Sequence, residues 1–332
     1  MKINRKSFLN QLESLQPGLS NEGGFEQSNC FVFGSGVICT FNDHIACSIP
    51  TVIAIEGAVQ AKSLLALLHK IPDKEIDITT VEGELRITAK SRRAGLRMEK
   101  TLPLNAIENP EKWLPLPDDF GEALATVETC ADNEDTRYAF TCIHICPDFL
   151  EASSGYQAAR YSIETGLQES MLVPRDGLVQ ILDLGMKEIG ESPKWLHFRN
   201  SDSLIISFRL HMGRFPRIAE ILSNEGDPII LPKDLGIACK TAEIFSSDGL
   251  DSSYVVIELK EGHLLIVGEG EYGWYKEKRE VEYTGPPLKF KIAPKLLAII
   301  AEKYGDKCKI ASMKLNINSG RFAYVTTLGR QT

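Results

Sequence analysis

Residues 263–283, HLLIVGEGEYGWYKEKREVEY, decide between two fold classes for this chain. The glycines at 268, 270 and 273 follow an apolar run with the spacing G-x-G-x-x-G, a pattern found in dinucleotide-binding folds. That pattern requires a helix after the last glycine, because the helix N-terminus receives the pyrophosphate. Residues 274–283 instead alternate between aromatic and charged side chains, which is typical of a strand. The stretch therefore predicts a glycine-rich hairpin and argues against a nicotinamide-dependent enzyme.

Similar hairpins recur along the chain at regular intervals. Turns are predicted at Glu82-Gly83, at residues 200–202 and at residues 318–320, about 118 residues apart. A second series of turns is predicted at Asn42-Asp43, at residues 153–155 and at residues 268–270. The repeats share the order of their elements and little sequence, which indicates three copies of one structural unit.

Helices follow the same repeat. Six segments carry apolar residues at spacings of three and four, and several are bounded by Pro or Gly: residues 4–15, 61–71, 118–130, 174–189, 232–245 and 294–304. The first, third and fifth segments open the three units, and the other three follow within each unit. The sequence therefore predicts an α+β fold with two helices and many antiparallel strands in each unit.

Composition sets the broad class. The chain has 332 residues, of which 43% are hydrophobic and 25% charged, and its net charge is −8. These values predict a globular protein of two or three domains, and they argue against a simple basic DNA-coating protein. No apolar run is long enough for a membrane helix, the N-terminus has no signal-peptide pattern, and the eight cysteines form no C-x-x-C pair. A cytoplasmic protein with reduced thiols and no membrane partner is expected.

Five short motifs in a fixed order carry a resemblance to a known family. They are DTRYAF at 135–140, SSGYQA at 153–158, VPRDGLVQIL at 173–182, GRFPRIAEIL at 213–222 and AYVTTL at 323–328. Together with the triplicate plan, they resemble the bacterial DNA polymerase III beta subunit, the sliding clamp. The resemblance is strongest over residues 120–222 and the last strand, and over 1–117 it rests on the order of elements. The weak similarity elsewhere indicates a divergent member, and a viral origin is one explanation for it.

The resemblance implies three tandem clamp domains, at residues 1–116, 117–230 and 231–332. Two such chains close head to tail into a ring, with helices lining a central hole through which duplex DNA passes without sequence readout. The ring tethers a DNA polymerase to its template, a clamp loader is a further expected partner, and the ring has no catalytic site, cofactor or metal of its own. Residues of the ring interface are too divergent here to assign.

A DNA-facing surface of this kind needs cations that contact phosphates without contacting bases. Arg137 and Tyr138 match a DNA-facing loop of the family, and the remaining candidates come from the six helical segments. The full set is Arg5, Lys6, Lys62, Lys70, Arg137, Tyr138, Arg175, Lys187, Lys233, Lys240, Lys295 and Lys303. Ordinary solvated helix faces are the alternative interpretation for each lysine, and the acidic segment 118–130 contributes little to such a surface.

The resemblance also implies an apolar pocket between domains two and three that binds an extended peptide from polymerase or loader. Mapped onto this chain, the pocket residues are Phe140, Ser153, Gly155, Tyr156, Ala158, Pro216, Ile221, Val325 and Thr327. Tyr156 stands where the family commonly has His, Gln157 where it has Arg, and Thr327 where it has a large apolar residue. These departures predict a smaller and more polar pocket, and core packing is the alternative role for Ile221 and Val325.

Other motifs indicate no catalysis. The spacing Cys142-x-His144-x-Cys146 places three metal-binding residue types on one face of a strand, but a fourth ligand is lacking and the two cysteines are about 13 Å apart. Nucleophile, zinc-protease and Walker patterns do not occur. The alternative from a different class is a structural or assembly protein of repeated β-rich domains, which would lack the GRFP and C-terminal strand motifs.

Overall fold

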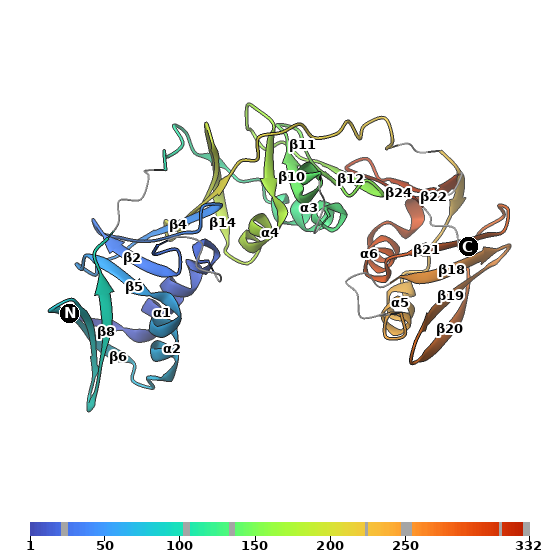
Figure 1. The fold of residues 1–332 in the computed structure, drawn as a ribbon. Coiled ribbons are helices and arrows are strands. Elements are labelled where there is room, and N and C mark those ends of the chain that lie inside the picture. The colour runs from blue at the N-terminus through green and yellow to red at the C-terminus, as the bar shows by residue number, and fades with distance from the viewer. Residues whose placement is uncertain are drawn as a thin grey trace. The chain divides into compact units, whose positions relative to one another are not determined.

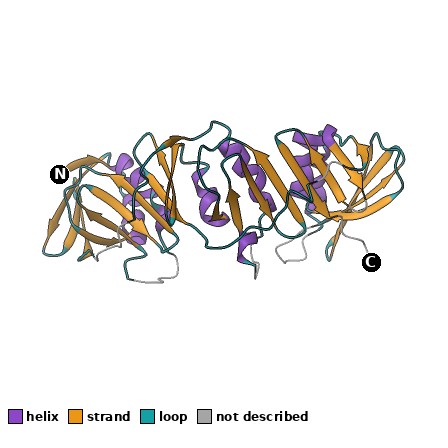
Figure 2. Ribbon diagram, turned by 90° about the horizontal axis from the view of Figure 1, so that it is seen from above, coloured by secondary structure: helices purple, strands orange, loops and turns teal. Residues whose placement is uncertain are grey.

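The computed structural model describes residues 1–20, 26–101, 107–132, 137–222, 225–246, 254–311 and 314–327, leaving aside the side chains at 295, 296, 299 and 303. The chain forms two compact units, one of residues 1–121 with 165–213 and the other of residues 122–164 with 214–332 (Figure 1). In each unit, helices pack against antiparallel strands (Figure 2). The α+β class expected from the sequence is confirmed.

Unit 1 is built on a long antiparallel arrangement of strands in the order β1-β6-β7-β8-β5-β2-β3-β4-β16-β15-β14-β9. Its elements are β1 Lys2–Asn4, α1 Arg5–Ser14, η1 Gln16–Gly18, β2 Cys30–Gly34, β3 Val37–Phe41, β4 Ile45–Pro50, β5 Gly57–Gln60, α2 Ala61–Lys70, β6 Glu75–Val81, β7 Glu84–Ala89, β8 Arg92–Glu99, β9 Leu114–Pro115, β13 Met171–Pro174, α4 Arg175–Leu178, η4 Val179–Ile181, β14 Met186–Ser192, β15 Trp195–Asn200 and β16 Ile205–Arg209. The helix α3, Phe120–Val127, begins in this unit.

Unit 2 has two sheets. One contains strands in the order β10-β11-β12-β24-β23-β22-β17, and the other has the order β20-β19-β18-β21. Its elements are η2 Glu128–Cys130, η3 Tyr138–Thr141, β10 Cys142–Ile145, β11 Phe149–Ser153, β12 Gln157–Ser162, β17 Asp227–Ile229, α5 Leu235–Glu243, β18 Val255–Lys260, β19 His263–Gly270, β20 Gly273–Glu280, β21 Leu288–Ile292, α6 Pro294–Tyr304, η5 Gly305–Lys307, β22 Cys308–Ala311, β23 Lys314–Asn318 and β24 Phe322–Thr327.

Local sequence explains where the helices begin. The Asn4 side chain accepts a hydrogen bond from the Ser7 backbone N–H at 3.0 Å, so it caps the first turn of α1. Phe8, Leu9 and Leu12 then lie on one buried face of that helix. The helix α6 begins at Pro294, whose missing N–H would have no partner in a first turn.

The segment that decided the fold class forms a hairpin. The strands β19 and β20 pair from His263↔Glu280 to Gly270↔Gly273, so no helix follows the glycine run and the dinucleotide reading is excluded. The turn lies at Glu271-Tyr272 and not at 268–270, because the strand continues through Gly270. A Cβ on Gly268 would lie 2.1 Å from the carbonyl oxygen of Ala242, so this glycine allows α5 to pack on the strand.

The predicted helix over residues 174–189 is wrong in its second half. Residues 175–181 are helical, but Met186–Ser192 form the strand β14, which pairs with β15. Gly185, with a φ of 61°, stops the helical path. The apolar residues Met186 and Ile189, three apart, fit a helix face, but both become buried on a strand with a register shift between Met186 and Glu188.

The predicted hairpin turns at 82–83, 200–202 and 318–320 are confirmed between β6 and β7, β15 and β16, and β23 and β24. Glu82 and Gly83 both have positive φ, at 50° and 79°, as a two-residue hairpin turn of type I′ requires. Within the described residues, no helix is long and apolar enough to cross a membrane.

Candidate functional site

The strands β12 and β24, far apart in the sequence, pair side by side in unit 2 and carry much of the expected pocket. Ala158 faces Val325 directly in this ladder, and Gln157 faces Thr326. Beyond the last ladder pair, the Thr327 backbone N–H donates to the Tyr156 carbonyl oxygen at 2.9 Å, and the Thr327 hydroxyl donates to the same oxygen at 3.1 Å. The pairing brings the SSGYQA and AYVTTL motifs together.

The turn between β11 and β12 is held by the hydroxyl of Ser153. This hydroxyl donates to the Gln157 carbonyl oxygen at 2.8 Å and accepts from the Gly155 N–H at 3.1 Å. Gly155 has a φ of 82°, and a Cβ there would lie 2.9 Å from Nη2 of Arg137. The Arg137 guanidinium in turn lies 4.1 Å from the centroid of the Phe140 ring. The short turn therefore presents its backbone beside a cation.

A small apolar cluster lies next to this turn. Ala158, Ile218 and Val325 form a buried cluster, and Phe215 and Leu222 pack against it. Ala158 and Val325 are therefore packed in the core of the junction, with exposed fractions of 0% and 4%. Sequence reasoning missed Ile218 and Phe215, although the apolar positions 215, 218 and 222 have the spacing of one helical face.

The exposed part of the site comes from fewer residues. Tyr156 is 75% exposed and Ile221 is 43% exposed, both high values for large apolar side chains. Thr327 is also exposed, Pro216 is half-buried and Phe140 is buried. Tyr156 and Ile221 are thus the accessible apolar side chains among the nine expected pocket residues, and Phe140, Ala158 and Val325 lie beneath the surface.

Gln157 has a structural role. Its side-chain amide donates to the Thr129 carbonyl oxygen at 2.9 Å, and its side-chain oxygen accepts from the Tyr324 hydroxyl at 3.2 Å. Tyr324 is fully buried. The Gln157 side chain is therefore tied into the core.

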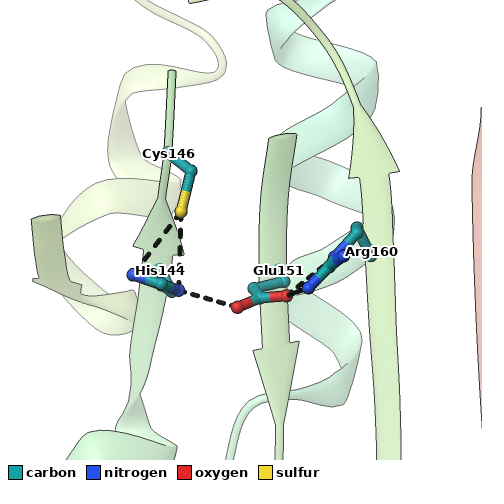
Figure 3. Close-up of polar contacts among 4 residues, drawn as sticks. All are labelled: His144, Cys146, Glu151 and Arg160. Carbon is teal, nitrogen blue, oxygen red and sulfur yellow. Dashed lines mark hydrogen bonds and ion pairs between the residues drawn. The ribbon is translucent and has the colours of Figure 1, made fainter. Parts of the chain in front are cut away.

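A network of polar contacts lies on the neighbouring strands, as Figure 3 shows. The buried carboxylate of Glu151 receives the Arg160 guanidinium at 2.6 and 2.9 Å, and its other oxygen lies 2.7 Å from Nδ1 of His144. The His144 ring stacks on Phe215 with centroids 4.9 Å apart. The network therefore orients the His144 ring that stacks on Phe215.

The thiol of Cys146 completes this network without becoming reactive. Its sulfur lies 3.5 Å from Nε2 of His144. Burial, and then the nearby carboxylate of Glu151, raises the pKa of the Cys146 thiol to about 12. A thiol with this pKa is neither an activated nucleophile nor a prepared metal ligand, and no group of three or more potential metal ligands occurs among the described residues.

The candidate DNA-contacting residues divide by environment. Arg5 is half-buried, and its guanidinium donates to the carbonyl oxygens of Leu68 at 2.9 Å and Asp73 at 3.1 Å. It therefore caps the C-terminal end of α2. Arg175 is paired with Asp176 at 3.1 Å. Both cations stabilise local structure in addition to any contact with a ligand.

The remaining cations of the set are placed as follows. The lysines at 6, 62, 70, 187, 233 and 240 are exposed: they are Lys6, Lys62, Lys70, Lys187, Lys233 and Lys240. Arg137, which precedes η3, and Tyr138, its first residue, are exposed. Lys295 and Lys303 belong to α6, and their side chains lie outside the described part. Lys187 was expected on a helix but lies on the strand β14, because the helix ends before Gly185. Lys233 lies just ahead of α5.

No family model and no curated protein sequence matches the chain. Solved structures do match it, and three of them are described here. A DNA polymerase III subunit beta from Pseudomonas aeruginosa is similar over all of both chains, with 17% identity and a TM-score of 0.82. A sliding clamp from Bartonella birtlesii has 19% identity and a TM-score of 0.83, covering 100% of this chain and 99% of that one. A DNA polymerase III beta subunit from Thermotoga maritima has 14% identity and a TM-score of 0.80 at the same coverage.

The whole chain therefore has the fold of the bacterial beta sliding clamps. The expected resemblance is confirmed at the level of structure, and the low identity agrees with a divergent sequence.

Proposed function

We propose that this protein is a DNA sliding clamp, a non-catalytic ring that encircles duplex DNA and tethers a polymerase to it. The full-length similarity to beta clamps carries this proposal, because it spans every element of the chain and not a single motif. The proposed domains are residues 1–116, 117–230 and 231–332. Processivity would then come from the topological link and the high effective concentration of the tethered polymerase.

Contact with DNA is proposed to be electrostatic. Exposed lysines such as Lys6, Lys62 and Lys70 suit loose contacts with phosphates that leave the base sequence unread. The affinity of a protein for DNA rises with each phosphate that it neutralises. The overall charge of −8 therefore favours weak contacts that let the ring move along DNA, and not tight binding at one place.

A second proposal concerns partner peptides from polymerase and loader, which would dock on the β12–β24 junction. Exposed Tyr156 and Ile221 supply apolar surface there, and the Arg137 guanidinium lies beside the Gly155 turn. An extended segment with one apolar anchor and a polar or acidic neighbour suits these contacts.

Self-association is proposed to join edge strands head to tail. Residues 92–97 of β8 pair with β7 alone, and β20 ends its sheet. Near β20, Ile237, Ile244 and Trp274 are 65–71% exposed, so they offer apolar surface to a partner chain. Backbone pairing and apolar burial would therefore hold the joint.

Charge contributes little attraction at this joint. The strand β8 has a net charge of +2, from Arg92, Arg93 and Arg97 against Glu99. The strand β20 has a net charge of +1, from Lys276, Lys278 and Arg279 against Glu277 and Glu280. Moderate salt should strengthen the ring because it screens this repulsion, in contrast to its effect on DNA contacts.

The test uses the full chain loaded on nicked circular DNA by a clamp loader, followed by gel filtration. Retention on circles and loss after linearisation supports a topological link, and negative-stain images should show closed rings of two chains. Equal loss from circles and linear DNA, with particles that have no hole, contradicts the clamp and favours a structural or assembly protein.

A double substitution separates the pocket from the ring. Tyr156→Ala with Ile221→Ser should abolish the stimulation of the cognate polymerase and leave retention on circular DNA unchanged, because both side chains are exposed. Retained stimulation would place the peptide site elsewhere.

A further inference from the structure

A second strand junction in unit 1 is built like the β12–β24 junction. The strand β4 pairs with β16, with Ile45 facing Phe208. Just past this pair, the Arg209 N–H donates to the His44 carbonyl oxygen at 2.8 Å. The Thr327 N–H makes the same contact with Tyr156 at the other junction. The β3–β4 turn and the end of β16 therefore repeat the geometry of the β11–β12 turn and the end of β24.

An open cavity of about 440 Å³ lies beside this second junction. Phe41 and Trp195 form an aromatic wall, with ring centroids 6.2 Å apart and planes inclined at 52°. Trp195 is 8% exposed, so its position is fixed by the surrounding chain. A cavity of this volume, at the lower end of the range for ligand sites, accommodates one large apolar side chain and its neighbours.

Two cations, Arg209 and Lys194, lie on the rim of the cavity. The Arg209 guanidinium lies 4.9 Å from the centroid of the Trp195 ring, and Asp43 holds it through Nη2 at 2.7 Å. Among the described residues, Nη1 of Arg209 and the exposed ammonium of Lys194 have no hydrogen-bond or ion-pair partner. Glu108 is the single carboxylate among the described lining residues.

We propose that this cavity, which we call the Trp195 cavity, is a second peptide-binding site and takes an acidic segment of a partner protein with one aromatic or large aliphatic anchor. The anchor packs on Phe41 and Trp195, and acidic neighbours approach Lys194 and Nη1 of Arg209. The prior pairing of Arg209 with Asp43 orders its guanidinium before binding, which lowers the entropy cost of the contact. Duplex DNA offers the negative charge but no apolar anchor for the aromatic wall.

The inference stands apart from the clamp function, because every group that carries it lies in unit 1 and none belongs to the surfaces assigned to DNA, ring closure or the β12–β24 junction. Failure of either proposal therefore leaves the other open to its own test.

The experiment uses the full chain and a fluorescein-labelled pentapeptide, Asp-Asp-Bpa-Asp-Asp, in which Bpa is the photo-cross-linker benzoylphenylalanine. Ultraviolet irradiation should place the cross-link on peptides that contain Phe41 or Trp195. The charge-reversed peptide Lys-Lys-Bpa-Lys-Lys should bind several-fold more weakly. A short duplex DNA serves as a competitor that has the charge and lacks the anchor.

Two matched variants test the rim. Lys194→Glu should lower the affinity for the acidic peptide about five-fold, because a carboxylate that repels the peptide replaces the exposed ammonium. Lys74→Glu changes the net charge by the same amount at an exposed position of unit 1 outside the cavity, and it should leave affinity unchanged. Equal weakening by both variants, equal binding of the basic peptide, displacement by duplex DNA, or cross-links away from the cavity would each overturn the proposal.

Discussion

Acid should destabilise unit 1 through a single buried histidine. His197 on β15 is 0% exposed, its Nε2 lies 2.9 Å from the Ser192 hydroxyl, and its Nδ1 lies 2.7 Å from the Ser207 hydroxyl. Trp113 meets the ring edge-on, with centroids 6.3 Å apart. Burial lowers the pKa of His197 from 6.5 to about 4, because the imidazolium would lose its hydration.

The sign of the effect follows from this shift. The unfolded chain takes up the proton at pH values near 6.5, whereas the folded chain resists it until about pH 4. Stability is therefore fully present above pH 6.5 and falls as the pH is lowered through this window. At 1.36 kcal/mol per pH unit, the loss is about 2 kcal/mol at pH 5 and about 3 kcal/mol at pH 4.

Urea unfolding followed by tryptophan fluorescence between pH 8 and pH 4 measures this loss, since Trp113 and Trp195 both report on unit 1. The variant His197→Gln serves as the control. It removes the titrating group. On going from pH 8 to pH 5, its free energy of unfolding should therefore fall by about 2 kcal/mol less than that of the parent, and by about 3 kcal/mol less on going to pH 4. Parallel pH profiles for the two proteins would refute the assignment, whatever their absolute stabilities.

Three further predictions concern packing, a buried ion pair and the thiols. Gly268→Ala should destabilise unit 2 by about 2 kcal/mol, because the new Cβ meets the Ala242 carbonyl oxygen, whereas Gly34→Ala has open space and should change stability little; urea midpoints compare the two. Glu151→Gln should cost about 3 kcal/mol in the same assay by leaving the part-buried Arg160 guanidinium without its buried carboxylate partner, and Lys307→Gln, at an exposed pair, should cost under about 0.5 kcal/mol. Thiol reagents at pH 8 should label the seven buried cysteines only after unfolding, since burial raises the pKa of six of their thiols to between about 11 and about 12; rapid labelling of the folded chain would contradict this.

Local sequence signals predicted the elements well where turn chemistry was explicit. The hairpin at Glu82-Gly83 was predictable because Gly83 adopts without strain the positive φ that its position in such a turn needs. The strand after Gly273 was predictable from alternation of side-chain type. Residues 186–189 were misassigned because two apolar residues three apart suit a helix as well as an irregular strand.

The candidate site was only partly visible in the sequence. Motif order indicated the β12–β24 junction, but Ile218 was overlooked in favour of exposed Ile221. Arg5 was predicted to contact DNA because it is a cation in a helical segment. Its guanidinium instead donates to carbonyl oxygens of a segment more than sixty residues away. Such partners lie beyond the reach of any local pattern.

The sequence by itself determined the α+β class, the threefold recurrence of hairpins and the absence of a helix after the glycine run. These properties depend on backbone preferences and on the period of apolar residues, which act over a few neighbouring positions. Only the tertiary structure decided which strands pair across long separations, such as β4 with β16 and β12 with β24. It also decided that burial lowers the pKa of His197 and that Arg209 lies over Trp195, because burial and orientation arise when distant segments pack and exclude water.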